Sequence, residues 1–169
     1  MPLMSTYVKL YLGMSVTDKE MDVIAEPQDE ILSHVTNKTL HMGVLGGTMY
    51  GLLFSALRKS TRNHDAMVIL VQRYVIRGGV AGALCGPCLM VGYCQYYMKM
   101  NNNQLFDRAY RLRQNSAQFR VDRTFQAGLL TGGIISLFAG SGLLFGAAIG
   151  GSSGLLTMTL LNKKGIFDI

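Results

Sequence analysis

Charge is scarce in this sequence of 169 residues: Asp, Glu, Lys and Arg make up 15% of it, and apolar residues make up 49%. Soluble domains carry about 25% charged residues. The scarcity is also uneven, because no charged residue lies between Arg77 and Lys99 or between Arg123 and Lys163. About 20 apolar helical residues cross the hydrocarbon core of a bilayer, so the first run is long enough for one span and the second for two. These runs exclude an ordinary soluble domain and predict an all-α membrane protein that crosses the bilayer several times.

The chain also lacks the motifs of common catalytic and ligand sites. It has no HExxH, no P-loop and no GxSxG, and its three Cys and three His are too few for a zinc ribbon. We therefore expect no catalytic residue, no cofactor and no metal ion, and the protein is not predicted to be an enzyme. Basic loops beside membrane spans usually face lipid headgroups or acidic partners, so nucleic acid is not an expected partner either.

Residues 1–35 form an acidic, polar N-terminal arm. They lack the basic start and early apolar run of a secretory signal, and they lack the Arg-rich composition of a mitochondrial presequence. Any organelle-targeting signal is therefore expected to be internal. At Glu26-Pro27 the sequence predicts the start of a long helix, because proline favours the first helical position and Asp29 and Glu30 favour the positive end of the helix dipole.

The first span is predicted over residues 36–57, and Arg58 follows it. Lys38 and His41 lie near its start, where a long side chain reaches the interface by snorkelling. With His34 they share one helix face, an arrangement that also suits a proton path. We favour the interfacial interpretation, because the sequence shows no acid within the span to partner these residues.

The remaining spans follow from the two uncharged runs. A polar connection at 58–73 leads to a second span over 74–97, and a basic connection follows at 98–123. The last run, 124–161, breaks best at the small residues of 139–142 and gives a third and a fourth span. The 98–123 connection is either an amphipathic helix on an anionic lipid surface or a solvated or protein-facing basic linker. The residues predicted to contact anionic phospholipid such as cardiolipin, or acidic partner groups, are Arg108, Arg111, Arg113 and Arg120.

Small residues recur at four-residue intervals in every predicted span. Positions four apart lie on nearly one helix face, and in lipid glycine lets two backbones approach to van der Waals contact. One such pair is weak evidence, since glycine is common in membrane helices, but four aligned series favour a tight four-helix assembly, a glycine zipper. The residues predicted to mediate helix packing are Gly43, Gly47, Gly51, Gly78, Gly82, Gly86, Gly128, Gly132, Gly142, Gly146, Gly150 and Gly154.

Cys85-Gly-Pro-Cys88 has the letters of a thioredoxin redox motif. A thioredoxin cysteine is activated at the N-terminus of a helix that follows a strand, and no such strand is predicted here. In an apolar setting the reactivity of a thiol falls. Cys85, Cys88 and Cys94 are therefore interpreted as small buried packing residues. A disulfide among the three stays open, and a membrane thiol oxidoreductase is the least favoured function.

The small-residue series resembles that of a four-helix family of the mitochondrial inner membrane, over about residues 36–161. This family includes the channel-forming and regulatory subunits of the presequence and carrier translocases, and a related four-span accessory subunit of respiratory complex I. Its signature at the entry to the third span runs Arg, three residues, Asp, six residues, a small residue, Gly, three residues and Gly. Ala127 to Gly132 supply the last part, four residues after Asp122, and Gln118 stands at the position of the arginine.

We divide the chain into the arm at 1–35, a four-span domain at 36–161 and a short tail at 162–169. The resemblance, with its departures from the signature, implies a structural accessory subunit of complex I (NADH:ubiquinone oxidoreductase) that stabilises the membrane arm and its assembly, with the membrane subunits of this respiratory-chain complex as partners. The alternative is a translocase subunit whose acidic arm attracts basic presequences. The positive-inside rule weakly favours an orientation with both termini in the intermembrane space.

Overall fold

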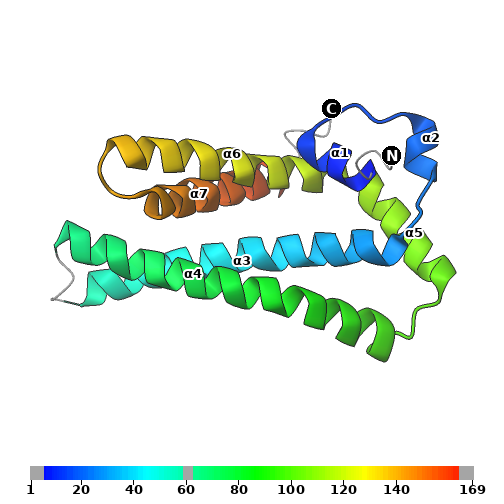
Figure 1. Ribbon diagram of the computed structural model, residues 1–169, viewed down its shortest axis with the longest axis horizontal. Coiled ribbons are helices and arrows are strands. Elements are labelled where there is room, and N and C mark those ends of the chain that lie inside the picture. The colour runs from blue at the N-terminus through cyan, green and yellow to red at the C-terminus, as the bar shows by residue number, and fades with distance from the viewer. Residues whose placement is uncertain (1–5, 59–62, 164–169) are drawn as a thin grey trace.

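The computed structural model describes residues 6–58 and 63–163, and every regular element in these ranges is a helix (Figure 1). This confirms the all-α prediction for the described part of the chain. In chain order the elements are α1 (Thr6–Leu12), α2 (Asp18–Asp22), α3 (Pro27–Leu57), α4 (His64–Leu89), the π-helix η2 (Met90–Tyr97), α5 (Asn102–Gln114), α6 (Ser116–Phe138) and α7 (Leu143–Lys163).

Within the described ranges, three segments are long and apolar enough to cross a membrane: Pro27–Leu57, His64–Tyr93 and Leu143–Asn162. By the length and composition of its helices the chain is therefore a helical membrane protein. α6 is different, because charged residues occupy its first half, including Asp122 and Arg123, and only its second half is uncharged.

Local sequence signals explain where several helices begin and end. α3 begins at Pro27 and is followed by Arg58, as predicted. α5 begins with a capping box, in which Asn101 and Gln104 each bond the backbone N–H of the other. These signals fix the bounds of the helices without reference to their tertiary partners.

The predicted break at 139–142 is confirmed as the turn between α6 and α7. Gly140 and Gly142 have φ angles of 72° and 83°, a region that glycine adopts more easily than other residues. Gly142 therefore belongs to the turn, and its prediction as a helix-packing residue is wrong.

The predicted polar connection at 58–73 is wrong in its second part, because α4 already begins at His64. The first turns of α4 carry apolar residues, and Val71 is fully buried. It packs against Gly51 of α3 and lies in one apolar cluster with Ala148 of α7. The apolar residues in these first turns of α4 are too few to cross a membrane by themselves, and they extend the neighbouring span.

The basic connection at 98–123 contains two helices, because the chain breaks at Asn115 between α5 and α6. Leu105, Ala109 and Arg113 of α5 are buried, whereas Asp107 and most other polar residues of this helix are exposed. α5 lies across the starts of α3 and α6, at the same end of the molecule as α1 and α2 (Figure 1). We call this end, formed by α1, α2 and α5, the arm end.

α3 packs along α4, and α6 packs along α7, so that the long helices form two antiparallel pairs (Figure 1). Glycines stand where the backbones approach most closely. A Cβ atom on Gly43 or on Gly78 would lie within 3.0 Å of the other glycine's backbone, and the same holds for Gly128 and Gly150. Only a residue without a side chain permits this approach.

The remaining predicted packing glycines also face a partner helix within one pair. A Cβ atom on any of them would come within 3.0 Å of the neighbouring helix, and they are Gly47, Gly51, Gly82, Gly86, Gly132, Gly146 and Gly154. By contrast, a Cβ atom on Gly46 would meet nothing within 4 Å. A glycine in one of these helices therefore does not by itself mark a site where two helix backbones approach closely.

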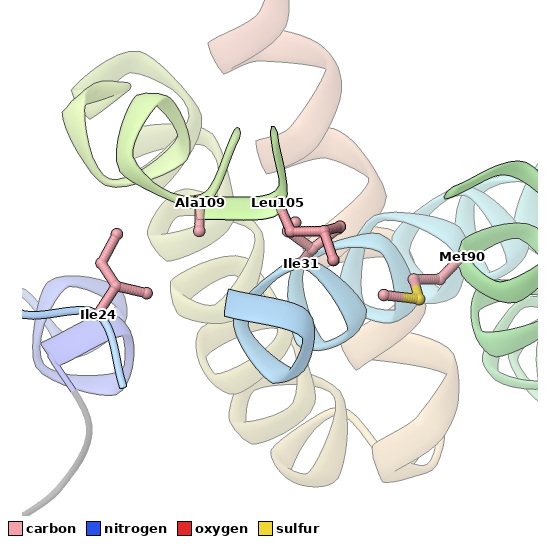
Figure 2. Packing of buried hydrophobic residues seen from close by; sticks show 5 residues of the cluster. All are labelled: Ile24, Ile31, Met90, Leu105 and Ala109. Carbon is pink, nitrogen blue, oxygen red and sulfur yellow. The ribbon is translucent and has the colours of Figure 1, made fainter. Parts of the chain in front are cut away.

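A second apolar cluster holds the arm end together. It joins Ile24, Ile31, Met90, Leu105 and Ala109, which come from the α2–α3 connection, α3, η2 and α5 (Figure 2). Burial of these side chains fixes α5 against the first turns of α3 and the last part of the α4–η2 helix.

We predict that Gly47→Ala destabilises the protein by about 1–3 kcal/mol, because the added methyl group overlaps the backbone of α4 at Tyr74 and Val75. Gly46→Ala is the matched control, since its methyl group enters open space and alanine favours the helix by up to about 1 kcal/mol. Thermal unfolding in detergent micelles measures both. Equal unfolding temperatures for the two variants would contradict the packing assignment.

Candidate functional site: buried ion pairs at the arm end

Arg113 of α5 is buried, with 3% of its surface exposed, and its guanidinium binds two segments at once. Nε donates to Glu30 Oε2 at 2.8 Å, and Nη2 bonds the other oxygen of the same carboxylate. Nη1 donates to the backbone carbonyl oxygens of Glu20, Met21 and Val23 at 2.8, 3.0 and 3.2 Å. The paired charge makes the burial of Arg113 tolerable, and its bonds satisfy carbonyl groups at the end of α2.

A second buried cluster joins α3 to α6. Lys38 Nζ lies 2.5 Å from Asp122 Oδ1, and His41 Nδ1 lies 3.4 Å from the same oxygen. Asp122 is fully buried, and the His41 ring packs on Phe125 with a centroid distance of 3.9 Å. Within residues 6–58 and 63–163, Asp122 Oδ2 has no hydrogen-bond partner. The carboxylate thus depends on the ammonium group of Lys38 for compensation of its charge.

α1 covers this cluster through aromatic residues. Tyr7 Oη is hydrogen-bonded to His34 Nδ1 at 3.2 Å, and Tyr11 donates to Asn37 Oδ1 at 3.0 Å. Burial, and next the charge of Asp122, raise the pKa of the Tyr7 phenol above its ordinary value. Tyr7 therefore remains neutral and keeps its hydroxyl proton for hydrogen bonding.

A partly buried ion pair ties α1 to α2. Lys9 bonds the carboxylate of Glu20, and Thr17 contributes its backbone N–H at 3.0 Å and its hydroxyl at 3.1 Å. The hydrogen bond from Lys9, and then those from Thr17, lower the pKa of Glu20 to about 2. The arm is therefore connected to itself as well as to α3 and α5.

The predicted snorkelling of Lys38 and His41 is wrong. Both side chains turn toward α6, where Asp122 supplies the acid that the first span lacks in sequence. The spacing of His34, Lys38 and His41 does indicate a polar face of α3. Its partner lies 84 residues from Lys38, so no local pattern could identify it.

The four predicted arginines occupy different environments. Arg108 is exposed and lies over the ring of Tyr93, 5.7 Å from its centroid, and Arg111 is exposed and pairs with Asp107 at 2.9 Å. Arg120 is half-buried at the start of α6, and Arg113 is buried and paired with Glu30. Only Arg108 and Arg111 of this set therefore present their charge on the outer surface.

The thiols of Cys85 and Cys88 are free and exposed. Their interpretation as buried packing residues is wrong, and they are not joined in a disulfide. They lie in the last turns of α4 beside Pro87, inside a continuous helix rather than at a helix N-terminus. The side chain of Cys94 lies outside the described part of the structure.

Within residues 6–58 and 63–163, no group of three or more His, Cys, Asp or Glu side chains is placed to hold a metal ion. The clusters at the arm end are ion pairs between helices, and their chemistry is that of fixing helix positions. Long apolar helices that pack at glycine and are tied by buried charges at one end define a helical membrane protein.

Residues 7–161 match the model of a family described as protein of unknown function, DUF1757. Because the match covers nearly the whole chain, the protein belongs to the DUF1757 family. No curated protein matches the chain in sequence.

We predict that Asp122→Asn destabilises the protein by about 3 kcal/mol, because Lys38 then retains an unpaired charge at a largely buried site. Lys38→Met in the same chain should recover part of this loss, since the double variant has neither charge. Asp107→Asn, which breaks an exposed pair, is the control and should cost less than about 1 kcal/mol. Unfolding in micelles gives the double-mutant cycle, and strictly additive effects would refute the coupling.

We predict that Glu20 titrates with a pKa of about 2 instead of its ordinary 4.5. A lowered pKa means that the contact with Lys9 stabilises the arm above pH 4.5, and that this contribution is lost as the pH falls toward 2. The carboxyl carbon resonance of Glu20, followed by NMR against pH, measures the value. In Lys9→Met the pKa should return toward 4.5, and an unchanged value there would assign the shift to another cause.

Proposed function

We propose that this protein is a non-catalytic, four-span protein of the mitochondrial inner membrane and a structural accessory subunit of respiratory complex I. The observation that carries the proposal is the close packing of α3 on α4 and of α6 on α7 at glycine, which leaves the outer faces of the long helices apolar. Such a unit can stabilise its neighbours by contact. It offers large apolar faces for other membrane subunits and for lipid.

The fourth span is α6. Its partner α7 is long and apolar enough to cross a membrane, and Gly128 and Gly132 of α6 pack against Gly150 and Gly146 of α7. If α7 spans the bilayer, the uncharged second half of α6 lies at the same depth. The charged first half of α6 then lies at the arm end, where Lys38 compensates Asp122.

The outer faces of the helices support contact with lipid or with other membrane subunits. Large apolar side chains are exposed on each long helix, among them Leu53, Leu84, Leu130, Phe138 and Leu160, and Phe138 is 90% exposed. In water a surface of this kind would drive association. In a bilayer it suits a subunit whose role is to fill the space between larger membrane subunits.

Within the four-helix family that the sequence resembles, the choice of complex I rests on the departures from the translocase signature. Gln118 stands at the position of the signature arginine, and the carboxylate of Asp122 takes its positive partner from α3 instead. Asp122 is thus paired across two helices, and the chain lacks the arginine that the translocase signature places before it. We therefore favour the accessory branch over the translocase branch.

Orientation follows from the shared position of the arm end. α1, α2 and α5 lie at one end of the molecule, and the end of α3, the start of α4 and the α6–α7 turn lie at the other (Figure 1). We place the arm end in the intermembrane space and the basic connection after Arg58 in the matrix, as the positive-inside rule favours. Arg108 and Arg111 would then contact anionic phospholipid such as cardiolipin at the outer surface of the membrane.

We predict that the protein co-migrates with NADH dehydrogenase activity on native gels of mitochondria solubilised in mild detergent. Its depletion should lower the amount of assembled complex I several-fold while leaving the turnover of each remaining complex unchanged, because it supplies contacts and no catalytic group. Re-expression of Gly47→Leu should restore the complex less well than re-expression of the unchanged chain. Co-migration with import intermediates would instead assign the protein to a translocase, and unaltered complex levels after depletion would refute the accessory role.

A further inference from the structure

A half-open cavity of about 700 Å³ lies at the arm end, between α1, the α2–α3 connection and the first turns of α3. Its lining includes Tyr7 and Tyr11 of α1, Val23 before α3, and Arg113. The α3 residues that line it, up to Asn37, precede or begin the predicted first span. In the proposed topology, with the first span at 36–57, the cavity therefore opens on the aqueous side of the membrane.

Apolar side chains form much of the cavity wall. Val8 and Val23 line it and remain 38% and 69% exposed, and Tyr7 and Tyr11 contribute their rings. The backbone of Val23 is held in place, because its carbonyl oxygen accepts a hydrogen bond from Arg113 at 3.2 Å. A ligand that covers Val8 and Val23 would remove this apolar surface from water.

The cavity also carries excess negative charge. Two of its acids are paired, Glu20 with Lys9 and Glu30 with Arg113. Glu26 and Asp29 line the same cavity, and neither has an ion-pair partner among residues 6–58 and 63–163. They also favour the positive end of α3, but that role needs neither a cavity nor apolar walls.

The walls of the cavity are held in place by the protein itself. Arg113 fixes Glu30 on one side and the carbonyl oxygens of Glu20 and Val23 on the other. A ligand would thus meet a formed site and would lose little free energy in ordering it. The charge excludes the phosphate group of an anionic lipid and favours a cation.

We propose that this cavity docks a segment of a neighbouring protein subunit that carries a Lys or Arg beside an apolar side chain. The cation pairs with Glu26 and Asp29, and the apolar side chain covers Val8 and Val23. The inference rests on the proposed function, because an accessory subunit has constant neighbours, and it names the surface through which the arm holds one of them.

Crosslinking in the intact complex tests the docking. Benzoylphenylalanine in place of Val23 should, on illumination, attach to one protein neighbour, and the matched control in place of Met14, which is exposed at the same end but does not line the cavity, should not attach to that neighbour. A carbodiimide, which joins carboxylates directly to amines, should link Glu26 or Asp29 of the unchanged protein to a lysine of the same neighbour if its cation is lysine. Mass spectrometry identifies the linked peptides.

The outcomes separate the two proposals. Attachment of position 23 only to phospholipid, only to this chain, or to nothing would overturn the docking inference, even if the protein co-migrates with complex I. Attachment to a partner outside complex I would keep the cavity as a protein-docking site and would refute the proposed function. Attachment to the same neighbour from positions 14 and 23 alike would show mere proximity and would also overturn the docking inference.

Charge reversal provides a second test on the folded chain. Glu26→Lys with Asp29→Lys should lower the amount of the protein retained in the complex several-fold, because the neighbour's cation would meet like charge. Asp18→Lys with Asp22→Lys makes the same change in net charge on exposed residues that do not line the cavity, and it should leave retention unchanged. Equal losses for the two double variants would show a general effect of charge and would overturn the inference.

Discussion

Contact between helix backbones at glycine is the constraint on which the rest of the structure depends. In hydrocarbon, two apolar helices gain little by leaving lipid for each other, so they associate through close packing. α3 meets α4 at Gly43 and Gly78, and α6 meets α7 at Gly128 and Gly150, with no room for a methyl group at either site. Each pair therefore has one register and one rotation, and these determine which polar side chains can meet at the arm end.

The two helix pairs contact each other much less than the helices within a pair do. Polar groups supply several of the contacts that join the pairs: Lys38 binds Asp122, and Ser152 Oγ donates to Thr48 Oγ1 at 3.2 Å. A buried carboxylate is costly unless it is paired. The position of α6 beside α3 is thus specified by charge as well as by packing, and a slide of one pair along the other would leave Asp122 without compensation.

The arm end combines a rigid frame with an exposed surface. Arg113 links α5 to the end of α2 and to the start of α3, while the cluster around Leu105 packs the same helices together. Polar connections near a membrane are often mobile, but these are held by the same contacts that position the spans. The position of the arm is therefore coupled directly to the position of the long helices.

The sequence by itself determined the helical class, the apolar runs, the start of α3 at Pro27 and the turn at Gly140, because each depends on composition or on the conformation of a few adjacent residues. It also identified the packing glycines, although it counted Gly142 among them as well as in the predicted turn, and the structure leaves Gly142 in the turn alone. Only the tertiary structure decided that Asp122 partners Lys38 and that Arg113 is internal. Such pairings depend on how each helix is rotated about its axis against another, and that rotation is set by contacts between segments far apart in the chain.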